Sequence, residues 1–160
     1  MTLVQENALG WLAGLLQEAQ AFEQAAQASA IDPEVAEAFA WLAQVDGDCL
    51  ASLHAAASGL RPVSEGRSLS ESCGGLDPEV PEAGATILAR HRDAILSCAE
   101  AAFADPMSDL VRAAIKSHHA HLQHAATVAR RLARRHTLQA LQAPPHGRPT
   151  APRPERTASP

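Results

Sequence analysis

The sequence predicts an all-α protein, folded as an antiparallel four-helix bundle with a long connection between the second and third helices. Three observations favour this fold class. Alanine, a strong helix former, is the commonest of the 160 residues, whereas aromatic residues, which strands prefer, make up only 3%. Prolines divide the chain into long proline-free stretches. Within these stretches apolar residues recur three and four positions apart, which is the spacing of one helix face.

The first two helices are expected over about residues 2–30 and 33–58. Thr2 and Gln5 have the spacing of a capping box, which stabilises a helix start. Asp32 before Pro33 is typical of an N-cap with proline in the first turn, and Gly59 suits a C-cap. Because only a tight turn separates the two helices, they should form an antiparallel hairpin.

The third and fourth helices are expected over about 81–104 and 106–140, as a second antiparallel hairpin that begins its last helix at Asp105-Pro106. The crossover between the hairpins, residues 60–79, is rich in Ser and Gly. At up to ~3.3 Å per residue it can run the length of the bundle. Residues 143–160 are rich in Pro and Arg and predict a disordered tail, which leaves residues 1–142 as the bundle domain.

Charge is unevenly distributed along the chain, whose net charge is −5. Residues 1–60 contain acidic side chains but no Lys or Arg, whereas residues 110–154 contain basic side chains but no Asp or Glu. The simplest interpretation is that the two halves attract each other within one bundle. Nucleic acid is a poor candidate partner, because the acidic half would repel phosphate and stacking aromatics are scarce.

The chain carries features of a cytoplasmic protein. Its three cysteines, Cys49, Cys73 and Cys98, form neither a disulfide framework nor a Cys-x-x-Cys metal motif. The first residues lack the basic region of a signal peptide, and no apolar run approaches the ~20 residues that cross a bilayer. We therefore expect a cytoplasmic protein without a membrane partner.

Each predicted helix has one apolar stripe, which we expect to face the core. The four stripes comprise Val4, Ala8, Trp11, Leu15, Glu18, Phe22 and Ala25; Val35, Phe39, Leu42, Asp46, Cys49, Leu53 and Ala56; Ile87 or Leu88, His91, Ile95, Cys98 and Ala102; and Val111, Ala114, His118, His121, Ala125, Val128 and Leu132. Ionisable or sulfur side chains interrupt every stripe near its middle. Since a buried unpaired charge costs several kcal/mol, these side chains should meet one another at mid-bundle.

This layout resembles the small bacterial ferritin-like four-helix bundles, including families described only as domains of unknown function. The resemblance covers about residues 1–136 and rests on the two hairpins, the crossover, and the stretches LLQEAQAFEQAAQ and IKSHHAHLQHAATVARRLA. In that superfamily a di-iron site uses one Glu on each of two helices and Glu-x-x-His on each of the other two. Glu18 matches the first helix, and His91 stands near the place of a Glu on the third. The Glu-x-x-His motifs are replaced by Asp46-x-x-Cys49 and His118-x-x-His121.

The resemblance implies a ferritin-like bundle that binds a transition metal, Fe, Zn or Cu, at mid-bundle. The implied ligands are Glu18, Asp46, Cys49, His91, His118 and His121. Because these motifs are degenerate, we expect binding rather than ferroxidase activity or other enzymatic turnover. As an alternative, His118 and His121 are neutral core histidines satisfied by Glu18 or Asp46. Cys49 and Cys98 could equally be small buried hydrophobes.

A second function remains open, that of a non-catalytic protein-interaction or regulatory bundle. Its acidic protein partner would bind the basic end of the fourth helix and the tail. The basic residues concerned are Arg130, Arg131, Arg134 and Arg135. Two copies could also associate as a homodimer through exposed apolar strips. Hydrolytic triads, phosphate-binding glycine loops and dinucleotide fingerprints are absent from the sequence.

Overall fold

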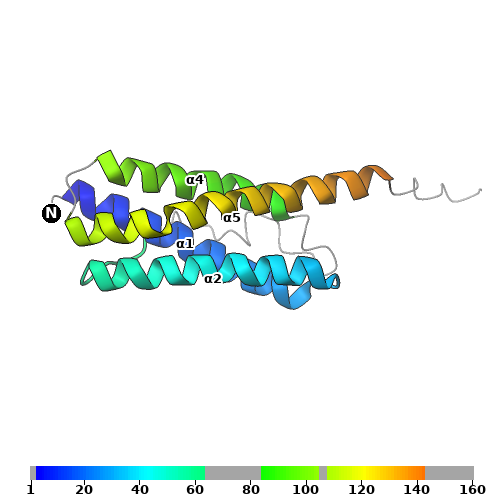
Figure 1. The fold of residues 1–160 in the computed structure, drawn as a ribbon, viewed down its shortest axis with the longest axis horizontal. Helices are drawn as coiled ribbons and strands as arrows, with labels where there is room; N and C mark the ends of the chain where they lie inside the picture. Colours follow the sequence, from blue (N-terminus) through cyan, green and yellow to red (C-terminus); the bar gives the residue numbers. More distant parts are fainter. Residues whose placement is uncertain (1–2, 64–83, 105–107, 143–160) are drawn as a thin grey trace, which may run out of the picture.

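The computed structural model describes residues 3–63, 84–104 and 108–142, and in these ranges it contains four helices and no strand (Figure 1). The helices are α1 (Leu3–Ser29), α2 (Pro33–Ala56), α4 (Ala85–Ala104) and α5 (Asp109–Gln142). This confirms the prediction of an all-α protein with four helices, and each helix lies close to its predicted range. Most of the predicted crossover and the whole predicted tail lie outside the described residues.

The four helices surround one core. α1 packs against α2 and α4, and α5 packs against the same two helices. In the described residues no Cα atom of α1 comes within 8 Å of α5, nor one of α2 within 8 Å of α4, so these two pairs lie diagonally across the bundle. α5 is the longest helix, and its C-terminal turns extend past the other three (Figure 1). None of the described helices combines the length and the apolarity that a membrane span requires.

Local sequence signals explain where two helices begin. The carboxylate of Asp32 accepts a hydrogen bond from the backbone N–H of Glu34 (2.9 Å) and Pro33 occupies the first helical position, which confirms the predicted start of α2. α5 begins later than predicted. Its described cap is Ser108, whose hydroxyl accepts a bond from the backbone N–H of Val111 (3.3 Å), while Asp105 and Pro106 lie outside the described residues.

The core is apolar and alanine-rich. Phe22 and Phe39 meet edge to face with ring centroids 6.3 Å apart. The predicted stripe of α2 is correct from Val35 to Leu53. On α1, however, the buried non-glycine residues are Leu9, Leu12, Ala13, Leu16, Ala19, Phe22, Glu23 and Ala26, so most of the buried face lies one residue beyond the predicted stripe. One residue rotates a helix face by about 100°.

The predicted buried faces of α4 and α5 are also partly wrong. α4 buries Arg92 and Ala99 where His91 and Cys98 were expected. α5 buries Ile115 and Leu122, while His118 is half-buried and His121 is exposed. The predicted inward placement is therefore wrong for His121 and only partial for Glu18, His91 and His118.

The segment that follows α2 crosses α1 at two glycines. The backbone N–H of Val63 donates to the carbonyl of Gly10 (2.8 Å). A Cβ atom on Gly14 would lie 1.9 Å from the Val63 carbonyl oxygen, and one on Gly10 would lie 2.9 Å from the Arg61 carbonyl oxygen. Only glycine permits this close approach of two backbones.

Candidate functional site

Three charged side chains from three helices meet in the core, and we call them the buried charge cluster: Glu23 of α1, Asp46 of α2 and Arg92 of α4. None is more than 1% exposed. The Arg92 guanidinium donates through Nη2 to Glu23 Oε1 and through Nη1 to Asp46 Oδ1. It also approaches the carbonyl of Leu42 (3.5 Å). A planar guanidinium suits this role because its separate N–H groups can hold two carboxyl groups at once.

Burial controls the ionisation of this cluster. Desolvation raises the pKa of Glu23 to about 9, although the charge of Arg92 opposes the rise. Desolvation likewise raises the pKa of Asp46 to about 6, again against the effect of Arg92. At neutral pH Glu23 is therefore a carboxylic acid, and Asp46 is the carboxylate that balances Arg92. Among the described residues, Glu23 Oε2, Asp46 Oδ2 and Arg92 Nε have no hydrogen-bond partner.

The six predicted metal ligands do not come together. Asp46 belongs to the buried charge cluster, and burial raises the pKa of the neighbouring Cys49 thiol to about 12, which keeps it protonated. His91 Nε2 forms a hydrogen bond with the carbonyl oxygen of Leu15 (2.7 Å). Burial lowers the pKa of the His91 imidazole. Glu18 is half-buried on α1.

The two histidines of α5 lie elsewhere. His118 Nε2 shares a hydrogen bond with Ser52 Oγ (2.8 Å), and its ring centroid is 6.4 Å from that of the exposed His121. Within residues 3–63, 84–104 and 108–142, no three His, Cys, Asp or Glu side chains are grouped so that they could hold a metal ion. As placed, the six residues do not fit a shared metal site, and the transition metal stays a prediction.

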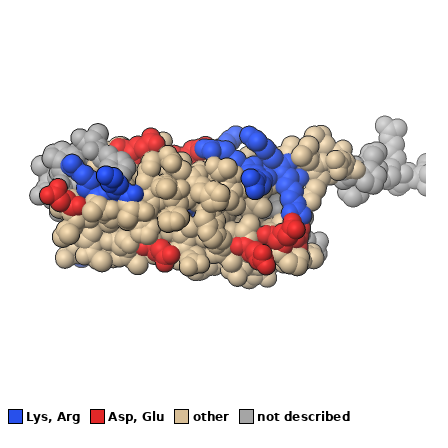
Figure 2. Space-filling view, in the orientation of Figure 1, with Lys and Arg blue, Asp and Glu red and all other residues tan. Residues whose placement is uncertain are grey.

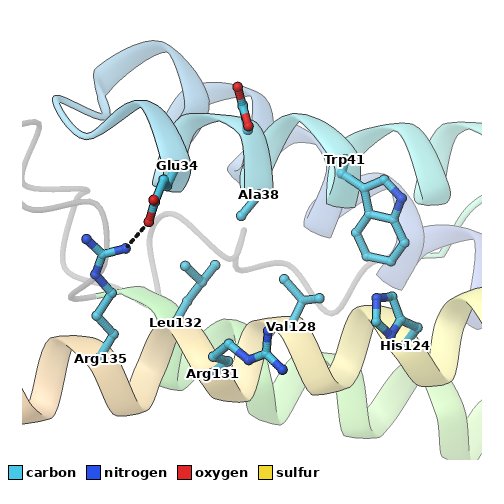
Figure 3. Close-up of a pocket in the computed structure, with 9 residues that line it drawn as sticks. Glu34, Ala38, Trp41, His124, Val128, Arg131, Leu132 and Arg135 are labelled. Carbon is cyan, nitrogen blue, oxygen red and sulfur yellow. Dashed lines mark hydrogen bonds and ion pairs between the residues drawn. The ribbon is translucent and has the colours of Figure 1, made fainter.

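A groove runs between α2 and α5, and we call it the α2–α5 groove (Figure 3). Its volume is about 490 Å³. The floor is apolar and consists of Ala38, Val128 and Leu132. At one end the Trp41 indole points from α2 toward His124 of α5, with ring centroids 5.0 Å apart and planes nearly perpendicular at 79°.

Charged side chains line the two sides of the α2–α5 groove with opposite signs. Glu34 and Glu37 stand on the α2 side, and Arg131 and Arg135 on the α5 side. Arg135 donates to Asp32 and to Glu34 (3.4 Å). These bonds join α2 and α5 at the end of the groove opposite Trp41. Arg131 is exposed and has no ion pair with any described residue.

A smaller cavity of about 210 Å³ lies on the other side of Trp41. Its lining is mixed: Trp41 and Val45 are apolar, whereas Asp48 from α2 and His118 and His121 from α5 are polar. His118 and His121 are thus two predicted ligands that line a common cavity. Trp41 lines both cavities.

The basic end of α5 is only partly neutralised by the bundle. Arg130 pairs with Asp93, and Arg135 pairs with Asp32 and Glu34. Arg131 and Arg134 are exposed and form no ion pair in the described ranges. In Figure 2 basic side chains gather over this part of α5 and meet acidic ones at the end of the bundle. The contacts of Arg135 support the interpretation that the acidic and basic halves attract each other.

Comparisons of this chain with protein-family models, with curated proteins and with solved structures give no match. Its function must therefore be inferred from its own residues and their arrangement.

The sequence interpretation missed Glu23, Arg92 and the groove around Trp41. A signal for the first two existed. Leu9, Leu12, Leu16, Ala19, Glu23 and Ala26 follow one another at alternating steps of three and four, as do Leu88, Arg92, Ile95, Ala99 and Ala102. Choosing the leucine-bearing series on each helix would have placed both charged residues in the core. The groove had no comparable signal, because it depends on how α2 and α5 pair.

Proposed function

We propose that this protein is a non-catalytic binding bundle whose α2–α5 groove takes an acidic segment of a protein partner. One observation carries the proposal: Arg131, an exposed cation without an ion pair among the described residues, stands beside an apolar floor that ends at Trp41. Trp and Arg are the residues that most often dominate binding energy at protein interfaces.

The groove favours a partner that presents two neighbouring side chains, one apolar and one acidic. An apolar side chain would rest on Val128 and Leu132, where each Å² removed from water contributes about 25 cal/mol. A neighbouring carboxylate would meet the Arg131 guanidinium, which can bind it through two parallel N–H groups. Arg134, three residues along the same helix, offers a second charged contact.

The two sides of the groove would also fix the orientation of the partner. Glu37 on the α2 side is exposed and repels an acidic side chain, whereas Arg131 on the α5 side attracts it. A segment with its acidic face toward α5 is therefore favoured over the reversed orientation.

The test uses short synthetic amphipathic peptides that carry Glu beside Leu or Phe, and the same peptides with Glu replaced by Lys. Titration calorimetry with the full chain should detect binding of the Glu peptides only. In NMR spectra the indole N–H of Trp41 should shift on binding, while that of Trp11, the other tryptophan, serves as an internal reference.

Two charge reversals separate the groove from general charge effects. Arg131→Glu should weaken binding of the Glu peptides at least about tenfold, since a residue that dominates an interface contributes about 2 kcal/mol or more. Arg90→Glu, at an exposed position of α4, makes the same change in net charge and should leave affinity nearly unaltered. Failure of every Glu peptide to bind, or equal loss in both variants, would refute the proposal.

We further propose that neighbouring helices run antiparallel and that the order is ferritin-like, with a crossover between α2 and α4. Support comes from contacts in which residue numbers run in opposite senses: Asp32 meets Arg135 and Ser52 meets His118 across α2 and α5. Across α4 and α5, Asp93 meets Arg130 and Glu100 meets His119. Spin labels at exposed positions 37 and 90 should then be closer together than labels at positions 37 and 100.

The predicted homodimer has a candidate surface at the end of α5. Leu138 and Leu141 are exposed there, 58% and 77% respectively, on the part of the helix that extends past the bundle (Figure 1). We propose that a second copy covers these leucines, since large exposed apolar side chains grouped on one face mark interaction sites. Light scattering should report a dimer that Leu138→Glu with Leu141→Glu converts to a monomer, and a wild-type monomer would contradict this.

A further inference from the structure

The buried charge cluster has the composition of a cation site, with a cation supplied by the chain itself. Two carboxyl groups, from α1 and α2, and the backbone carbonyl of Leu42 all point at one guanidinium. Oxygen donors of this kind are those that hold hard divalent cations in proteins. The two carboxyl groups also have one oxygen each, Glu23 Oε2 and Asp46 Oδ2, without a partner in the described ranges.

Arg92 provides the positive charge of the buried charge cluster, as the groups around it show. Nearby titratable groups are the Cys49 thiol on α2 and His91 on α4, and His91 is already bonded to Leu15. Among the described residues, Glu23 is the one charged side chain of α1 that is buried, and the buried side chains of α5 are all apolar. Arg92 therefore supplies the positive charge that reaches both Glu23 and Asp46.

We propose that Arg92 is an internal cation that occupies a latent divalent-cation site formed by Glu23, Asp46 and the Leu42 carbonyl. In the wild-type protein the guanidinium fills the site, so that no metal ion is needed there. Removal of the guanidinium should expose oxygen donors from two helices to an empty volume. A divalent cation could then take the place of the side chain.

Two substitutions distinguish this role from ordinary packing. Arg92→Ala removes the cation and leaves space, whereas Arg92→Met removes the cation but fills most of the space. Each should lower the ratio of folded to unfolded protein by about 100-fold or more, because breaking a buried ion pair leaves carboxyl groups without compensation. Only Arg92→Ala should be restored by added cation.

The probe is Mn²⁺, added to the full chain at slightly alkaline pH so that the carboxyl ligands can deprotonate. Urea unfolding should show at least tenfold stabilisation of Arg92→Ala by Mn²⁺, with electron paramagnetic resonance reporting one bound ion. Arg92→Met and the wild type should not respond. Adding Glu23→Gln to Arg92→Ala should remove the response, since one of the two carboxyl ligands is lost.

Three outcomes would overturn the proposal. The wild-type protein could lose stability when a chelator is added, which would mean that Arg92 is not its core cation. Arg92→Ala could remain unstabilised or unfolded with Mn²⁺ present, which would mean that no latent site exists. Arg92→Met could respond as strongly as Arg92→Ala, which would place the bound ion elsewhere. None of these results depends on whether the α2–α5 groove binds an acidic segment.

Discussion

The buried charge cluster and the basic end of α5 contain the same chemistry in opposite environments. In the core, Arg92 holds two carboxyl groups and none of the three side chains is more than 1% exposed. At the surface, Arg135 also holds two carboxylates, yet its side chain is 38% exposed and its neighbours Arg131 and Arg134 have no ion pair in the described ranges. The core charges must be compensated by the chain itself, whereas the surface charges can be left for water, salt or a partner.

The largest expected effect comes from the same substitution made in both places. Arg92→Met should lower the free energy of unfolding by about 3–5 kcal/mol, because it leaves buried carboxyl groups without their cation. Arg135→Met should cost at most about 1 kcal/mol, because its ion pairs are partly exposed. Chemical denaturation of the two variants measures the difference, and equal losses would show that the core pair is no more important than the surface pair.

Dependence on pH gives the next largest effect. The pKa of Glu23 is about 9 in the fold and 4.5 when unperturbed, so between these values the folded state holds a proton that the unfolded state has released. Stability should therefore fall as pH rises through this window, by up to about 1.4 kcal/mol per unit. Asp46 adds a fall in the same direction between pH 3.8 and about 6.

Glu23→Gln isolates this effect, because its amide resembles the protonated acid. The variant should lose most of the decline between neutral pH and pH 9, whereas Glu18→Gln, on the same helix but only half-buried, should keep it. Denaturant unfolding across the pH range is the measurement. A wild-type protein whose stability is flat over this window would contradict the assignment of a proton to Glu23.

Salt should affect the surface and spare the core. At about 1 M salt the screening length is only ~3 Å, so exposed pairs lose most of their attraction while buried pairs are screened much less. The stability difference between wild type and Arg135→Met, at most about 1 kcal/mol in low salt, should nearly vanish. The difference for Arg92→Met should persist, and its disappearance in salt would mean that water reaches the cluster.

The smallest expected effect concerns metal content. Because Asp46 is bonded to Arg92 and Cys49 remains protonated, we expect elemental analysis of protein from its native host to find no stoichiometric transition metal. Stoichiometric metal that disappears in Glu18→Ala and His118→Ala would instead support the metal site predicted from the sequence.

Helix number and position follow closely from the sequence, whereas the direction of each helix face does not. On α2 the bulky residues Val35, Phe39, Leu42 and Leu53 all lie on one side, so the stripe was unambiguous and correct. On α1 alanines surround the helix, and the series through Trp11 and Glu18 is nearly as apolar as the series through Leu12 and Leu16. Packing decides between them, by burying the three leucines Leu9, Leu12 and Leu16 and leaving Trp11 half-buried.

The candidate site was less predictable than the fold for the same reason. A rotation of about 100° moves Glu18 away from the core face of α1 and adds Glu23 to that face. On α4 the same rotation replaces His91 by Arg92, so an expected set of metal ligands becomes an ion cluster. The basic residues of α5 were identified correctly as a group. Which of them are neutralised within the bundle depends on the register between helices, which no single segment encodes.

The glycines at positions 10 and 14 govern the path of the chain far from their own helix. Alanine would be the natural choice at either place in so alanine-rich a protein, yet one added methyl group at Gly14 would overlap the Val63 carbonyl. The lack of a Cβ atom at Gly10 and Gly14 thus allows the segment after α2 to lie directly against α1. A change as conservative as Gly14→Ala would therefore have to shift this part of the chain, although it adds only one methyl group.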